Sequence, residues 1–112
     1  MRITTVATAA TALLAGAAIV LAAPSAQAET KYRVDTFATA TGFYHGGFLY
    51  AGRNYVFCKR WGDRVGTSGS HNHWWLLTDM DTGGRDYVSA YYLSRWGNDE
   101  ARDNSGTEIP NC

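Results

Sequence analysis

The sequence predicts an all-β domain because it is rich in aromatic residues, dotted with glycines and free of a helical apolar pattern. All four tryptophans, seven tyrosines and four phenylalanines lie after residue 28, where isoleucine, leucine and valine together number only nine. This composition favours strands, and it implies a core built largely from aromatic side chains. Eleven of the twelve glycines are scattered through the same region, and no stretch repeats apolar residues at the helical period.

The first 28 residues have the composition of a cleavable signal peptide. Arg2 supplies a positive charge, Ile3–Ala23 is apolar and rich in alanine, and Ala26-Gln27-Ala28 has the small-x-small pattern of a cleavage site. The alternative is an uncleaved membrane anchor, since the apolar stretch approaches the ~20 residues that span a bilayer. Pro24 interrupts the stretch, which favours cleavage. We expect residues 29–112 to be one exported, extracellular domain without membrane attachment. Association of this domain with the cell wall is implied by the family resemblance given below.

The charge of the expected mature domain restricts its partners. Residues 29–112 carry nine basic and ten acidic side chains, for a net charge of about −1 with neutral histidines. Nucleic acid and anionic membrane surfaces are excluded as partners, because binding to them needs an excess or a run of positive charge. We expect a monomer.

The first half of the domain is expected to contain two β segments. Glu29–Asp35 is a polar lead-in, and Thr36–Phe43 alternates and is rich in threonine, as a strand can be. Gly46-Gly47 then provides a turn. Phe48–Cys58 forms the second β segment, with a kink at Gly52.

The second half is expected to contain a hairpin flanked by loops. Trp74–Thr78 is the most strand-like run, Asp79–Gly84 supplies turn residues, and Arg85–Ser89 returns as the partner strand. Ser89 can then cap one tight helical turn that runs to Leu93. The expected loops are Trp61–Ser70, with a short strand around Val65, and Arg95–Asn111.

The two cysteines, Cys58 and Cys112, can form one disulfide in an exported chain. A bridge closing a loop of about 55 residues would remove roughly 4 kcal/mol of denatured-state entropy. The alternative is a reactive cysteine with a histidine partner. The bridge is favoured because it gives the terminal residue a structural role, the anchoring of the C-terminus to the domain.

The order of these features resembles the small secreted bacterial SH3-like domains that are common in actinobacteria. The matching stretches are Leu49–Cys58, Trp75–Gly83, Tyr87–Leu93 and Ile109–Cys112. The sequence departs from the pattern at Thr41–Gly47, where such domains often carry an R-x-G-P-like segment. The resemblance implies a small open β-barrel of about five strands, with a short 3-10 turn before the last strand and the Cys58–Cys112 bridge.

The resemblance also implies a non-catalytic binding domain for cell-wall glycopeptide (peptidoglycan), an extended peptide or a cell-envelope protein. Aromatic side chains would form its groove, as rigid rings often do at interfaces. Trp74, Trp75 and Tyr87 are instead expected to be core, and strand alternation turns one of the two tryptophans outward. The candidate ligand-binding residues are Tyr44, Trp61, Tyr91, Tyr92 and Trp96.

No catalytic, metal or cofactor site is predicted. His71 and His73 would share one face of a strand, but two imidazoles are too few for a metal without a third ligand. A calcium loop starting at Asp79 fails because its fifth and twelfth positions are Gly83 and Ala90. Other functions that remain open are an exported effector, such as an enzyme inhibitor or antagonistic protein, and a structural surface protein.

Overall fold

The computed structural model describes residues 29–112, and residues Lys31–Cys112 form one compact unit. The predicted signal peptide lies outside the described residues. The described part is all-β, as predicted, with one short 3-10 turn in place of any α-helix. Among residues 29–112, no helix is long and apolar enough to cross a membrane.

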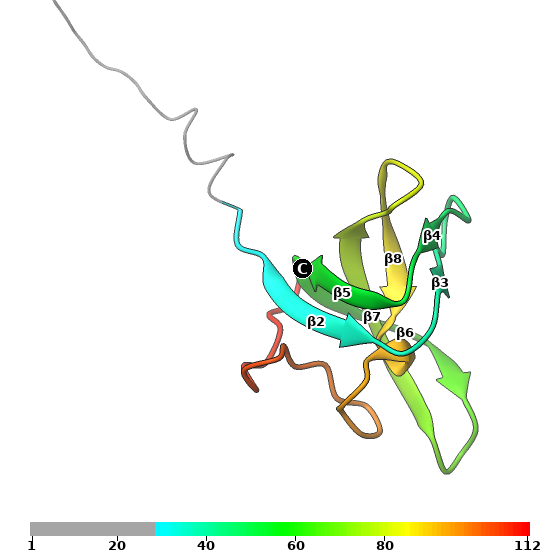
Figure 1. Cartoon of the computed structure of the whole chain (residues 1–112). Helices are drawn as coiled ribbons and strands as arrows, with labels where there is room; N and C mark the ends of the chain where they lie inside the picture. Colours follow the sequence, from blue (N-terminus) through cyan, green and yellow to red (C-terminus); the bar gives the residue numbers. More distant parts are fainter. Residues whose placement is uncertain (1–28) are drawn as a thin grey trace, which may run out of the picture. The chain divides into compact units, whose positions relative to one another are not determined.

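In residues 29–112, seven strands form three antiparallel sheets (Figure 1). The pairs are β2 with β5 and β3 with β4, and the third sheet has the order β6–β7–β8. The sheets do not close into one barrel, so the expected SH3-like barrel is not confirmed. The elements are β2 (Tyr32–Thr36), β3 (Ala40–Thr41), β4 (Phe48–Leu49), β5 (Gly52–Val56), β6 (Cys58–Gly66), β7 (His71–Asp79), β8 (Arg85–Ser89) and the 3-10 turn η2 (Ala90–Tyr92).

The core between the sheets is mainly aliphatic, which corrects the expectation of an aromatic core. The β2–β5 pair lies in front of the β6–β7–β8 sheet in Figure 1, and both contribute short side chains to one cluster. Most aromatic rings lie around this cluster and are half-buried or exposed. The buried cluster consists of Val34, Ala40, Leu49, Val56, Leu76, Met80, Val88, Ala90, Leu93, Ala101 and Ile109.

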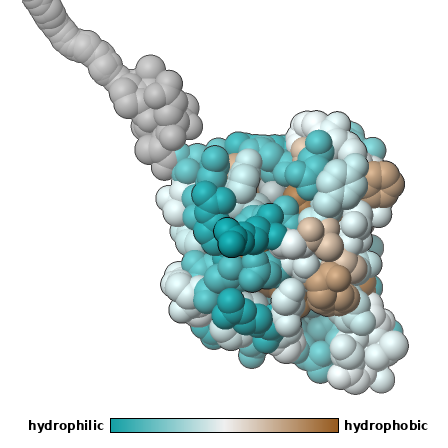
Figure 2. All heavy atoms as spheres, in the orientation of Figure 1, coloured by the Kyte–Doolittle hydropathy of each residue, from teal (hydrophilic) through white to brown (hydrophobic). Residues whose placement is uncertain are grey.

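The molecular surface shows little concentrated apolar area in the view of Figure 2, where hydrophobic residues form small separate patches among hydrophilic ones. The large hydrophobic side chains that remain exposed are aromatic: Phe37, Phe43, Tyr44, Phe48, Tyr50 and Trp61.

Strand β2 replaces most of the predicted polar lead-in. It pairs with β5 along its whole length, from Tyr32 opposite Val56 to Thr36 opposite Gly52. Val34 and Thr36 are buried, whereas Arg33 before them is exposed and Asp35 between them is half-buried. The prediction was wrong because a strand with one solvent-exposed face needs buried side chains only at alternate positions, and Thr36 fills one of these positions.

Strand β6 replaces the first part of the predicted Trp61–Ser70 loop. It pairs with β7 on both sides of an irregularity between Trp61 and Val65. The glycine and charges within this irregularity are typical of loops in sequence. In the structure they lie in a bulge at the sheet edge, where unpaired residues are tolerated.

The predicted hairpin and helical turn are confirmed. Asp79 pairs with Arg85 across the turn, where Gly83 and Gly84 have φ values of 108° and 75°. These values lie in the left-handed region that glycine adopts without a steric penalty. The Ser89 hydroxyl accepts the Tyr91 backbone N–H at 3.1 Å, so Ser89 caps η2 as expected.

The predicted bridge between Cys58 and Cys112 is also confirmed, with Cα atoms 4.9 Å apart. Backbone bonds on β6 support it, because the Lys59 N–H donates to the Pro110 carbonyl at 2.8 Å and the Cys112 N–H donates to the Lys59 carbonyl at 2.9 Å. Ile109 is fully buried beneath this segment. Between η2 and the C-terminus the chain forms isolated bridges rather than the last strand that the resemblance implied.

Candidate functional site

An aromatic groove lies on the side of the β6–β7–β8 sheet that faces away from the core. The β3–β4 loop and three strands line it, with a volume of about 170 Å³. Tyr44 and Trp61 stand at the groove with 59% and 52% of their surface exposed, so both rings are available to a ligand. The lining residues are Phe43, Tyr44, Arg60, Trp61, Gly62, Asp63, Trp75 and Tyr87.

Trp75 and Tyr87 belong to the groove and not to the core, which corrects the expectation for these two residues. Leu76 and Val88 are the buried neighbours of Trp75 and Tyr87 along β7 and β8, so alternation turns the two aromatic side chains to the opposite face. Trp74 packs against the core as expected. The sequence left open which of the two tryptophans points outward, and in the structure it is Trp75.

The Trp75 ring is held on three sides. Its indole N–H donates to the Asp63 carbonyl at 3.0 Å, and the Phe43 ring meets it edge-on with centroids 4.9 Å apart. Gly62 lies directly beside it, because a Cβ there would be 2.9 Å from the indole Cδ1. Gly62 in the bulge therefore lets Trp75 lie close to β6. The Trp75 ring is thereby part of an aromatic surface that is formed before a ligand binds.

The buried carboxylate of Asp86 fixes the β3–β4 loop beside the groove. Its oxygens accept the backbone N–H groups of Tyr44 at 3.0 Å and His45 at 2.6 Å, and that of Tyr87 at 2.7 Å. Gly42 leaves the space that this carboxylate occupies, since a Cβ there would collide with it. Burial acts to raise the pKa of Asp86, but these N–H donors outweigh it and hold the pKa below its ordinary value.

The other predicted ligand-binding residues do not join this groove. Tyr91 and Trp96 line a second cleft of about 160 Å³, together with the exposed Phe37. Tyr92 and Trp96 pack against the core cluster. Of the five candidates, the structure therefore places Tyr44 and Trp61 together at the groove and Tyr91 and Trp96 together at the second cleft. Trp61 lies on β6 rather than in a loop.

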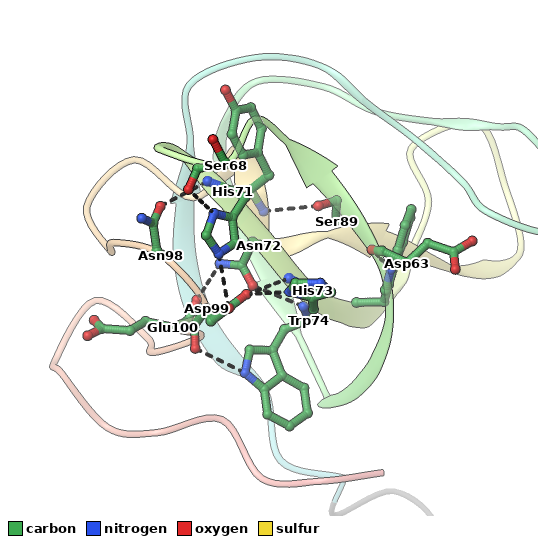
Figure 3. A network of polar contacts seen from close by, with 12 residues as sticks. Asp63, Ser68, His71, Asn72, His73, Trp74, Ser89, Asn98, Asp99 and Glu100 are labelled. Carbon is green, nitrogen blue, oxygen red and sulfur yellow. Dashed lines mark hydrogen bonds and ion pairs between the residues drawn. The ribbon is translucent and has the colours of Figure 1, made fainter.

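Figure 3 shows a cluster of two histidines and one aspartate, His71, His73 and Asp99. His73 stacks on the Trp61 ring, with centroids 4.6 Å apart and planes 11° from parallel. Asp99 approaches both histidines, with contacts of 3.2 Å to His71 Nε2 and 2.8 Å to His73 Nδ1. Burial acts to raise the pKa of Asp99, but hydrogen bonds from His73 and the charges of both histidines hold it below its ordinary value.

Asp99 is the member of this cluster that the sequence analysis missed. It lies 26 residues after His73 in a segment that reads only as a polar loop. Its backbone adopts φ of 57°, which asparagine and aspartate tolerate better than most residues. No spacing signal connects it with the histidines, because the contact depends on how the loop returns to the start of β7.

Comparison with protein-family models, with curated proteins and with solved structures finds no match for this chain.

Proposed function

We propose that this protein is an exported, non-catalytic binding domain of the SH3-like type that recognises cell-wall glycopeptide through its aromatic groove. The observation that carries the proposal is the pair of exposed rings, Tyr44 and Trp61, beside a floor formed by Trp75 and Tyr87. Aromatic rings present a large rigid surface at low entropic cost, and they are suited to stacking on sugar faces.

The size of the groove supports an extended ligand. Pockets that enclose small molecules measure roughly 300–1,000 Å³, whereas this groove measures about 170 Å³. It has room for one ring or side chain, so the rest of the ligand would run along the surface. Arg60 and Asp63 at the groove offer hydrogen-bonding partners of both charges to hydroxyl, amide and carboxylate groups.

Two further observations support export and the SH3-like arrangement. The disulfide fits an oxidising compartment. Hydrogen bonds also connect the sheets, since the Phe43 N–H donates to the Tyr87 carbonyl at 2.8 Å and the Phe57 N–H donates to the Leu77 carbonyl at 2.8 Å. Links of this kind between short strands are compatible with the proposed SH3-like arrangement.

We predict that the oxidised protein sediments with purified peptidoglycan and that Tyr44→Ala and Trp61→Ala each weaken this binding at least tenfold. Removal of a ring at the centre of an interface costs on the order of 2 kcal/mol or more. Tyr50→Ala is the matched control, because Tyr50 is 54% exposed but lies outside the groove. The dissociation constant follows from the bound fraction at increasing wall concentration.

Wild-type protein that stays in the supernatant at every wall concentration contradicts the proposal. The same holds if Tyr50→Ala weakens binding as much as the two groove variants. Retention by a single purified protein instead of the wall would favour the exported effector.

A further inference from the structure

The side chains of His71, His73 and Asp99 bring three potential metal-ligand atoms together. One donor atom from each residue lies within 4.8 Å of the others. Asp99 Oδ2 lies 3.2 Å from His71 Nε2, and Asp99 Oδ1 lies 2.8 Å from His73 Nδ1. Neighbouring ligands of a tetrahedral zinc ion lie about 3.3 Å apart for bonds of about 2.0–2.1 Å. The three side chains are therefore close enough together to share one ion.

The hydrogen bonds of His71 determine which of its nitrogens is free. Nδ1 lies 3.1 Å from the carbonyl oxygens of Thr67 and Ser68, which only accept hydrogen bonds, so Nδ1 carries a proton. Nε2 is therefore the His71 nitrogen that faces the Asp99 carboxylate, at 3.2 Å, and it is the nitrogen that a metal ion would take.

The same arrangement is typical of histidines that bind metals. A metal-bound imidazole usually donates its other N–H to a backbone carbonyl or carboxylate, which fixes the ring and its tautomer. The carbonyls of Thr67 and Ser68 do this for His71.

The loop that carries Asp99 is fastened to β7 by hydrogen bonds on either side of the cluster (Figure 3). The Asn98 side chain accepts the His71 N–H at 2.9 Å, and the Asn72 side chain donates to the Glu100 carbonyl at 2.8 Å. Asp99 itself accepts the His73 backbone N–H at 2.9 Å. The carboxylate is therefore held in place before any ligand arrives.

We propose that His71 Nε2, His73 Nδ1 and the Asp99 carboxylate bind one divalent transition-metal ion of the zinc type. Imidazole and carboxylate ligands suit zinc, and sites with three protein ligands keep a fourth position for water or another ligand. The three side chains are 19%, 28% and 33% exposed, so an ion can enter from solvent. This inference does not depend on the proposed wall binding.

The test is isothermal titration of the oxidised protein, purified without a polyhistidine tag, with zinc chloride. We expect one ion per chain, and at least tenfold weaker binding for His71→Gln, His73→Gln and Asp99→Asn. His45→Gln is the matched control, because His45 is the third histidine of the chain and lies outside the cluster. Circular dichroism establishes that each variant is folded.

Fluorescence quenching by copper(II) gives a second measurement, which does not rely on the heat of binding. Bound at His73, copper(II) would quench the fluorescence of Trp61, which stacks on His73, and of Trp74, whose indole N–H donates to the Asp99 carbonyl. Trp61→Phe would therefore remove only part of the quenching, whereas His73→Gln would remove most of it. Absence of saturable zinc uptake up to ~1 mM overturns the proposal. Uptake that is lost in His45→Gln but kept in the three cluster variants also overturns it.

Discussion

Loss of the Cys58–Cys112 bridge is expected to lower the free energy of unfolding by about 4 kcal/mol. The bridge closes a loop with a sequence separation of 54, and the loop-closure entropy that it removes from the unfolded chain has this size. Small domains are stabilised by only about 5–15 kcal/mol in total. The melting temperature of a Cys58→Ala, Cys112→Ala double variant should therefore fall by on the order of 15–30 °C.

The double variant is preferable to single replacements, which leave one thiol free to form intermolecular disulfides. Wild-type protein reduced by a phosphine provides the control, because it loses the bridge while keeping both side chains. A loss below about 1 kcal/mol in both samples would contradict the prediction. It would mean that the buried Ile109 and the backbone bonds at Lys59 restrain the tail without the bridge.

Replacement of Asp86 by alanine is expected to cost on the order of 3 kcal/mol and to abolish ligand binding at the groove. Three backbone N–H groups, those of Tyr44, His45 and Tyr87, would lose their acceptor. A buried donor left without a partner costs roughly 1–3 kcal/mol. The loop that carries Phe43 and Tyr44 would also lose its anchor, so the preformed groove would be lost with it. Urea denaturation gives the stability, and the sedimentation assay gives the binding.

Asp81→Ala is the matched control for this prediction. Asp81 also accepts a backbone N–H from a distant residue, Tyr50, at 2.8 Å, but this bond is exposed to solvent. Water can replace the acceptor there, so we expect a loss below about 1 kcal/mol and unchanged wall binding. Equal losses in the two variants would show that burial of the Asp86 carboxylate does not matter.

The lowered pKa of Asp86 leads to an expectation about acid stability. Its pKa in the folded state lies below the value of about 3.9 in the unfolded chain. The stability that it contributes is therefore fully present above about pH 4 and is lost as the pH falls through the folded-state pKa. Urea midpoints between pH 7 and pH 2 should show a smaller acid loss in Asp86→Asn than in the wild type. Parallel curves for the two proteins would contradict this assignment.

The sequence predicted the elements whose signals are local. The β7–β8 turn depends on Gly83 and Gly84, and the cap of η2 depends on Ser89, all within a few residues of the backbone that they shape. The disulfide was predictable because only two cysteines exist. Strand β2 and most of β6 were missed because pairing with a neighbouring strand, and not their own composition, makes them strands.

The candidate site was predictable only in part. Tyr44 and Trp61 were among the predicted ligand-binding residues, but their grouping depends on a loop that is placed by Asp86. The contact of Asp99 with the histidines likewise depends on where a polar loop returns to the sheet. Such contacts between distant segments leave no periodic pattern in the chain, so one sequence does not reveal them.

The C-terminal tail and the β3–β4 loop also cover parts of the two edges of the β6–β7–β8 sheet. At one edge, Lys59 of β6 exchanges backbone bonds with the tail, and at the other, the Tyr87 carbonyl of β8 accepts the Phe43 N–H. Open strand edges are templates for aggregation with other chains. The last residues of the chain therefore cover part of the β6 edge. Reduction of the bridge is expected to free this edge for pairing with other chains, so it would favour aggregation as well as unfolding.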